Sequence, residues 1–83
     1  MAKEVTIYST ATCGFCKMLR GYLNDKGVTY QLKMADEDEK IARELYDKSG
    51  QLGVPFTVVT DENGKEETIL GFDRPRIDAV LGL

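Results

Sequence analysis

The sequence predicts an α/β domain in which a four-stranded mixed sheet is flanked by three helices, in the order β-α-β-α-β-β-α. Apolar or alternating runs mark four strands, at residues 5–8, 28–34, 56–60 and 66–70. Between the first three runs, apolar residues recur at helical spacing. Asn63-Gly64 separates the last two runs and predicts an antiparallel hairpin. A right-handed crossover makes the first two strands parallel, so helices cover both faces of the sheet.

The first half of the chain is expected to form strand, helix and strand. Val5 and Ile7 should face the same side of the first strand, which we expect to be central in the sheet. The first helix is expected over residues 14–26, with Gly27 as its C-terminal cap. The predicted inward face of this helix consists of Phe15, Met18, Leu19, Tyr22 and Leu23. Strict alternation predicts the second strand over residues 28–34.

The second half begins with an acidic helix start. Asp36 and Glu39 have the spacing of a capping box, and acidic side chains favour the first turn of a helix. We expect this helix to end near Gly50. Its predicted inward stripe consists of Ile41, Ala42, Leu45 and Tyr46. After the hairpin, Asp73 is expected to cap a last helix over residues 74–81.

Length and composition limit the classes of protein to consider. With 83 residues, of which 42% are hydrophobic, we expect a single domain over residues 1–83 with one modest core. The net charge of −3 argues against a nucleic-acid partner. Residues 1–4 lack an apolar signal core and no stretch is long enough to span a membrane, so we expect no membrane partner and a cytoplasmic location.

The chain has two cysteines, Cys13 and Cys16, placed where the first strand gives way to the first helix. A Cys-x-x-Cys pair in this context indicates redox chemistry. The thiolate is the attacking species in disulfide exchange, and a helix start stabilises an anion. In such settings the pKa of a cysteine falls to about 3.5–7.5. We expect Cys13 to attack and Cys16, one turn further in, to resolve the mixed disulfide, with Lys17 adding positive charge nearby.

Two other uses of the cysteine pair stay open. A zinc site needs about four ligands, mostly cysteine and histidine. The chain has no histidine and no third cysteine, so zinc would require a second chain or carboxylates. A purely structural disulfide would close so short a loop that it would constrain little of the unfolded chain. We therefore expect a redox pair and no metal-binding residues.

Three segments, in this order and spacing, resemble the glutaredoxin family of the thioredoxin-like fold over essentially the whole chain. Residues 8–17, Tyr-Ser-Thr-Ala-Thr-Cys-Gly-Phe-Cys-Lys, resemble the family's active-site segment. Residues 49–55, Ser-Gly-Gln-Leu-Gly-Val-Pro, resemble the segment with its cis-proline. Gly71-Phe72-Asp73 stands at the place of its glycine-rich turn. The absence of an additional amino-terminal strand and helix favours a glutaredoxin over a full thioredoxin.

The resemblance implies an enzyme, a thiol–disulfide oxidoreductase of electron transport and cell redox homeostasis. It would reduce protein or glutathione mixed disulfides, with Cys13 attacking and Cys16 resolving. The residues implied to bind substrate or glutathione are Thr12, Phe15, Lys17, Gln51, Val54, Pro55, Phe72 and Asp73. Val54 is implied to pair its main chain with a bound thiol substrate, beside a cis bond to Pro55. Tyr8, together with Phe15 and Phe72, is implied to line the groove.

The sequence departs from the family where glutathione would be held. Thr10 stands where many glutaredoxins carry lysine, Gly53 replaces the usual threonine, and Phe72 replaces the second glycine of Gly-Gly. Residues 71–75 are also similar to small redoxins that serve ribonucleotide reductase and accept electrons from thioredoxin reductase. The expected electron source is therefore glutathione or thioredoxin reductase, with weak dependence on glutathione.

A further likeness gives the alternative function. Cys13-Gly14-Phe15 resembles the start of the Cys-Gly-Phe-Ser motif of glutaredoxins that share an iron–sulfur cluster between two chains. The alternative is thus an iron–sulfur carrier or sensor. Cys16 replaces the serine, which favours disulfide chemistry. We expect a monomer without a tightly bound cofactor, with glutathione as a co-substrate and disulfide-containing proteins as partners.

Overall fold

A computed structural model describes residues 3–51 and 53–83, and the elements follow in the predicted order. They are β1 (Glu4–Ser9), α1 (Gly14–Asp25), β2 (Gln31–Met34), α2 (Glu39–Ser49), β3 (Phe56–Thr60), β4 (Glu66–Leu70) and α3 (Arg74–Leu81). Met1, Ala2 and Leu52 lie outside the described residues, although the expected domain over residues 1–83 and the proline segment at 49–55 include them.

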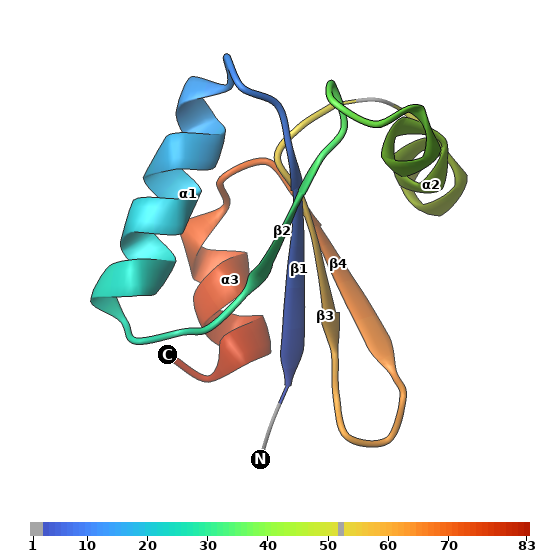
Figure 1. Cartoon of the computed structure of the whole chain (residues 1–83). Coiled ribbons are helices and arrows are strands. Elements are labelled where there is room, and N and C mark those ends of the chain that lie inside the picture. Colours follow the sequence, from blue (N-terminus) through green and yellow to red (C-terminus); the bar gives the residue numbers. More distant parts are fainter. Residues whose placement is uncertain (1–2, 52) are drawn as a thin grey trace.

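The sheet has the strand order β2-β1-β3-β4. β1 is parallel to β2 and antiparallel to β3, and β4 is antiparallel to β3, as predicted. Tyr8 lies opposite Phe56, and Phe56 lies opposite Leu70. The end of β1, the start of β3 and the end of β4 therefore meet at one end of the sheet, at the top of Figure 1.

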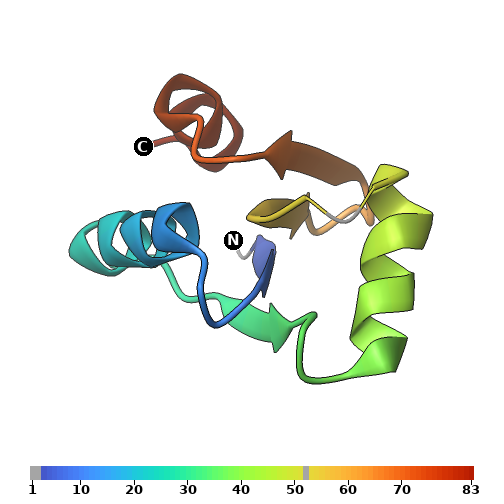
Figure 2. The same cartoon turned by 90° about the horizontal axis from the view of Figure 1, so that it is seen from above.

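Helices cover both faces of the sheet, with α1 and α3 on one face and α2 on the other (Figure 2). On the first face, Val5 and Ile7 pack in one cluster with Leu19 of α1 and Ile77 of α3. On the other face, Tyr8, Phe56 and Val58 pack with Leu45 of α2. The alternation along β1 thus follows the prediction. No helix in the described part of the chain is long and apolar enough to cross a membrane.

The second strand is shorter than predicted, because β2 begins at Gln31 and not at residue 28. The N–H of Val28 donates to the carbonyl of Leu23 at 2.9 Å, so this residue still belongs to the end of α1. Gly27 has a φ of 71°, the left-handed conformation that glycine adopts after a helix. Val28 and Tyr30 nevertheless pack against the core, which accounts for the alternation in the sequence.

The prediction of a capping box at Asp36 and Glu39 is wrong. The N-cap of α2 is Asp38, whose backbone is extended and whose Oδ1 accepts the N–H of Lys40 at 2.9 Å. Asp36 lies in the turn before the helix, and its Oδ2 accepts the N–H of Ala11 at 3.0 Å. Both acids suit a helix start, so spacing alone did not distinguish the cap from its neighbour.

The buried faces of the first two helices are narrower than predicted. α1 buries Cys16, Leu19 and Leu23, whereas Phe15 is 62% and Met18 54% exposed. Successive residues of a helix are turned by about 100°, so Phe15 faces away from the sector that Cys16 occupies. In α2, Leu45 is buried and Tyr46 is exposed for the same reason.

Candidate active site

The candidate site lies where three loops meet at one end of the sheet. Residues 10–13 follow β1, residues 53–55 precede β3, and residues 71–73 follow β4 (Figure 1). The strand register places the three strand ends that adjoin these loops side by side. A hydrogen bond of 2.8 Å from the N–H of Gly71 to the carbonyl of Pro55 joins the last two loops.

Cys13 and Cys16 form a disulfide, with 5.2 Å between their Cα atoms. Cys13 is the N-cap of α1, and its Sγ accepts the N–H of Cys16 at 3.1 Å. Cys16 is 0% exposed, whereas Cys13 is half-buried. The N–H groups and the dipole of a helix start stabilise negative charge. The geometry therefore offers one cysteine that is partly exposed and whose sulfur can carry a negative charge, and one fully buried cysteine next to it.

The loop before β3 brings Val54 and Pro55 to this end of the sheet. The peptide bond between them is cis, which confirms the expectation. Pro55 is buried and Val54 is half-buried against the core on the α2 face. Gln51 is exposed, and its Oε1 lies 3.2 Å from the place where a Cβ on Gly53 would stand. A side chain at position 53 would therefore compete with Gln51 for space.

Three other predicted residues surround the cysteines at the start of α1. Thr12, Phe15 and Lys17 are all exposed. Met18, one turn after Phe15, is a second exposed apolar side chain of α1. Where exposed apolar side chains form a contiguous patch, they commonly mark a contact surface for another protein.

Phe72 and Asp73, in the third loop, have partners inside the fold. The ring of Phe72 packs edge-on against Tyr22 of α1, with 6.0 Å between ring centroids. Asp73 caps α3 as predicted, accepting the N–H of Arg76 at 3.3 Å. The guanidinium of Arg74 lies 4.8 Å from the centroid of the Tyr22 ring. Phe72 and Arg74 thus contact α1, whereas Asp73 caps α3.

Comparison with known proteins shows the family to which this chain belongs. A sequence profile described as glutaredoxin matches residues 5–63. A "glutaredoxin-like 8.6 kDa protein in rubredoxin operon" of Clostridium pasteurianum is 34% identical over 77 residues, which cover 93% of this chain and 96% of that protein. The chain belongs to the glutaredoxin family. It is accordingly a redox protein whose Cys13–Cys16 pair is at disulfide distance.

Solved structures similar to this glutaredoxin include a methanoredoxin and another glutaredoxin. The methanoredoxin of Methanosarcina acetivorans is 26% identical, with a TM-score of 0.80 over 96% of this chain and 85% of that one. The glutaredoxin of Methanosarcina mazei is 28% identical, with a TM-score of 0.78 over 96% of this chain and 79% of that one. The fold is therefore thioredoxin-like, as the sequence predicted.

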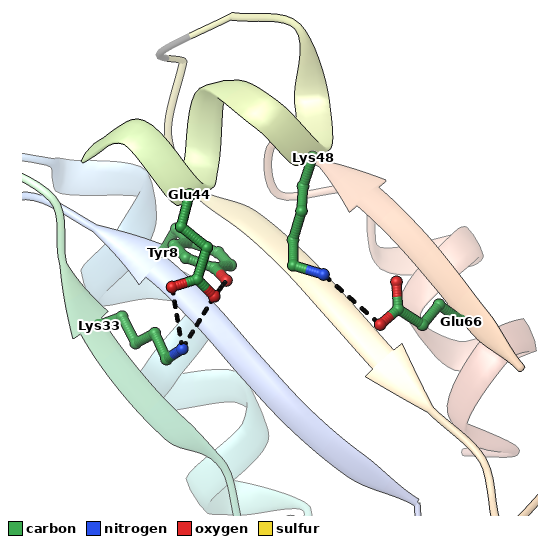
Figure 3. A network of polar contacts seen from close by, with 5 residues as sticks. All are labelled: Tyr8, Lys33, Glu44, Lys48 and Glu66. Atoms are coloured by element: carbon green, nitrogen blue, oxygen red, sulfur yellow. Dashed lines mark hydrogen bonds and ion pairs between the residues drawn. The ribbon is translucent and has the colours of Figure 1, made fainter. Parts of the chain in front are cut away.

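In this glutaredoxin, Tyr8 does not line the groove as expected. It is 1% exposed and its hydroxyl donates to Glu44 of α2, which also pairs with Lys33 of β2 at 2.9 Å (Figure 3). Burial, and then the bond to Glu44, raise the pKa of Tyr8. The bonds from Tyr8 and Lys33 hold the pKa of Glu44 below its usual range. This network secures α2 to the strand that leads into the cysteine loop.

Sequence reasoning assigned Asp36 a different role, as a helix cap, and missed Glu44. Both lie outside the family motifs quoted above, and each acts on a partner at least 25 residues away in the chain. Nothing in the local pattern distinguishes them from other acidic residues of the helix start and the helix surface. A surplus of carboxylates around 36–39 is the signal that some of them serve a purpose other than capping.

Proposed function

We propose that this glutaredoxin is a thiol–disulfide oxidoreductase that reduces disulfides of proteins through Cys13 and Cys16. The observation that carries the proposal is the unequal setting of the two sulfurs. Cys13 is partly exposed and its Sγ accepts an N–H at the start of α1, whereas Cys16 is fully buried. A dithiol mechanism needs this difference in exposure, because one sulfur must reach the substrate while the other stays shielded until it resolves the mixed disulfide.

The reaction would proceed by two exchanges. In the reduced protein, the Cys13 thiolate attacks a substrate disulfide, forming a mixed disulfide and expelling one substrate thiolate. Cys16 then loses its proton and attacks Cys13 Sγ, forming the Cys13–Cys16 disulfide and expelling the second thiolate. The leaving thiolates take up protons from solvent. Two electrons pass from the dithiol to the substrate.

The oxidised protein must then be reduced. Glutathione carries carboxylates, so tight binding requires positive charge or donors aimed at the groove. Arg74 is stacked on Tyr22, and position 10 carries a threonine without charge. Arg74 is exposed, and so is Lys17, which follows Cys16 directly in the sequence. We therefore propose weak dependence on glutathione and acceptance of electrons from thioredoxin reductase.

The setting of the relative agrees with such a role. The Clostridium pasteurianum protein is named for its place in a rubredoxin operon, which is a redox context. A reducing compartment such as the cytoplasm would keep the dithiol available for substrates.

A trapping experiment tests the assignment of the two sulfurs. Cys16→Ser should accumulate a mixed disulfide with a disulfide-bonded substrate protein, visible as an added mass that dithiothreitol removes. Cys13→Ser should form no adduct and should lack reductase activity. Thermal unfolding of both variants controls for loss of the fold. Adducts in Cys13→Ser and none in Cys16→Ser would reverse the roles.

A coupled assay tests the electron source. NADPH consumption is followed with a protein disulfide substrate, once with glutathione and its reductase and once with thioredoxin reductase alone. We expect turnover with thioredoxin reductase and slow turnover with glutathione. Fast turnover with glutathione and none with thioredoxin reductase would refute the proposed choice of reductant, but not the oxidoreductase.

A further inference from the structure

The cysteine loop has a tether that comes from a distant part of the chain. Asp36 Oδ2 accepts the N–H of Ala11 at 3.0 Å. Ala11 lies inside the turn that the N–H of Cys13 closes onto the carbonyl of Thr10 at 3.3 Å. Residues 10–12 also bond to Ser9 and Cys13. Among the described residues 3–51 and 53–83, the bond to Asp36 is the only one that joins residues 10–12 to a more distant part of the chain.

The position of Asp36 is fixed by the sheet. β2 is parallel to β1, with Met34 opposite Ser9. The next residue, Ala35, donates its N–H to the carbonyl of Ser9 at 2.8 Å and so extends the pairing by one step. Asp36 therefore leaves β2 just where residue 10 leaves β1. Its carboxylate is held beside the cysteine loop by backbone pairing, and not by a helix cap.

We propose that Asp36 is a positioning residue of the redox centre. By holding Ala11, it fixes the turn whose last residue is Cys13, and thereby keeps Cys13 Sγ in place to accept the N–H of Cys16. An N–H bound to a carboxylate makes a stronger hydrogen bond than one bound to a neutral acceptor. Asp36 acts through Ala11 and does not touch the reacting atoms.

The charge of Asp36 is expected to oppose the effect of its hydrogen bond. A carboxylate close to a thiol disfavours the thiolate, whereas an ordered helix start favours it. Two neutral variants separate the two effects. Asp36→Asn removes the charge and keeps an oxygen acceptor, and Asp36→Ala removes both. Glu37→Ala is the matched control, because it removes an adjacent exposed carboxylate for which the described structure gives no side-chain hydrogen bond.

The first measurement is amide hydrogen exchange at Ala11, followed by NMR. Losing a bond to a charged acceptor should speed exchange at this N–H by about tenfold or more in Asp36→Ala. Asp36→Asn should restore most of the protection, and Glu37→Ala should leave it unchanged. Equal exchange at Ala11 in the wild type and in Asp36→Ala would overturn the proposal, as would equal acceleration in Glu37→Ala.

The second measurement is alkylation of Cys13 by iodoacetamide in the reduced protein, located by mass spectrometry. The two neutral variants of Asp36 carry the same charge, so a slower reaction in Asp36→Ala than in Asp36→Asn reports the loss of position. We expect a several-fold difference, with similar thermal unfolding midpoints. Equal alkylation rates would refute the positioning role. The proposal rests on the proposed function, because a positioning residue matters only if Cys13 reacts. Neither measurement requires turnover, so a failure of the trapping experiment and a failure of this proposal can be told apart.

Discussion

Tyr8 and Glu44 should be energetically coupled, and a double-mutant cycle can measure the coupling. The two changes are Tyr8→Phe, which removes the hydroxyl and keeps the ring in the core, and Glu44→Ala, which removes its acceptor. The hydroxyl belongs to a side chain that is 1% exposed, so it has little access to water once Glu44 is gone. Each change alone should destabilise the protein.

The expected magnitudes follow from the surroundings of each group. A hydrogen bond to a charged group contributes about 1.5–3 kcal/mol. Glu44 is 36% exposed and keeps its ion pair with Lys33 at 2.9 Å, so Tyr8→Phe should cost about 1.5 kcal/mol, at the lower end. Glu44→Ala leaves a buried hydroxyl unpaired, at a cost of about 1–3 kcal/mol. In the Tyr8→Phe background that penalty disappears, so the coupling should be about 1–2 kcal/mol.

Urea unfolding followed by circular dichroism gives the four free energies of unfolding. In a domain of this size, a loss of 1.5 kcal/mol corresponds to a fall of about 6–12 °C in Tm, which provides an independent check. The ion pair of Lys48 and Glu66, 3.5 Å apart and on the surface, is the control (Figure 3). Glu66→Gln should change stability by less than about 1 kcal/mol. If the effects of Tyr8→Phe and Glu44→Ala add to within about 0.5 kcal/mol, the bond contributes no coupling and the reasoning fails.

Three further predictions concern the exposed apolar side chains of α1, acid stability and the last helix. Phe15→Ala and Met18→Ala should lower kcat/KM for a protein disulfide and leave that for a small disulfide unchanged; equal losses for both substrates would argue against a docking role. Because the folded-state pKa of Glu44 is depressed, its contribution is present above the unfolded value of about 4.3 and is lost as pH falls through the folded value. The urea midpoint should therefore fall more between pH 6 and pH 3 in the wild type than in Glu44→Gln, and parallel curves would contradict this. Asp73→Ala should cost about 0.5–2 kcal/mol of stability by removing the cap of α3, with Asp73→Asn recovering most of it in the same unfolding assay.

Much of the fold could be predicted because its signals are local. Strand runs, the Asn-Gly turn and the cap at Asp73 depend on neighbours within a few residues, and all of them appear in the structure. The start of β2 was misplaced because Val28 is apolar for packing against the core and not for pairing with β1. Alternation reports burial, and a residue that leaves a helix can be buried without joining a strand.

In the candidate site, too, local features could be predicted from the sequence and long-range contacts could not. The Cys-x-x-Cys motif and the proline segment are continuous in sequence, so the cysteine pair and the cis bond could be foreseen. The partners of Asp36 and Tyr8 could not be foreseen, because these hydrogen bonds join residues that are 25 and 36 positions apart in the chain. The exposure of Phe15 depends on the rotation of α1 over the sheet, which periodicity alone does not fix.

The far end of the sheet offers a place to attach the protein. The hairpin around Asn63 lies beyond the pairing of Glu4 with Thr60, at the opposite end from the disulfide (Figure 1). In the oxidised state the described chain has no free thiol, so Asn63→Cys would introduce a single group for maleimide coupling while the native pair protects itself. Subsequent reduction would free the redox pair. A bead or electrode joined at this hairpin would then present the cysteines outward, in the same orientation on every molecule.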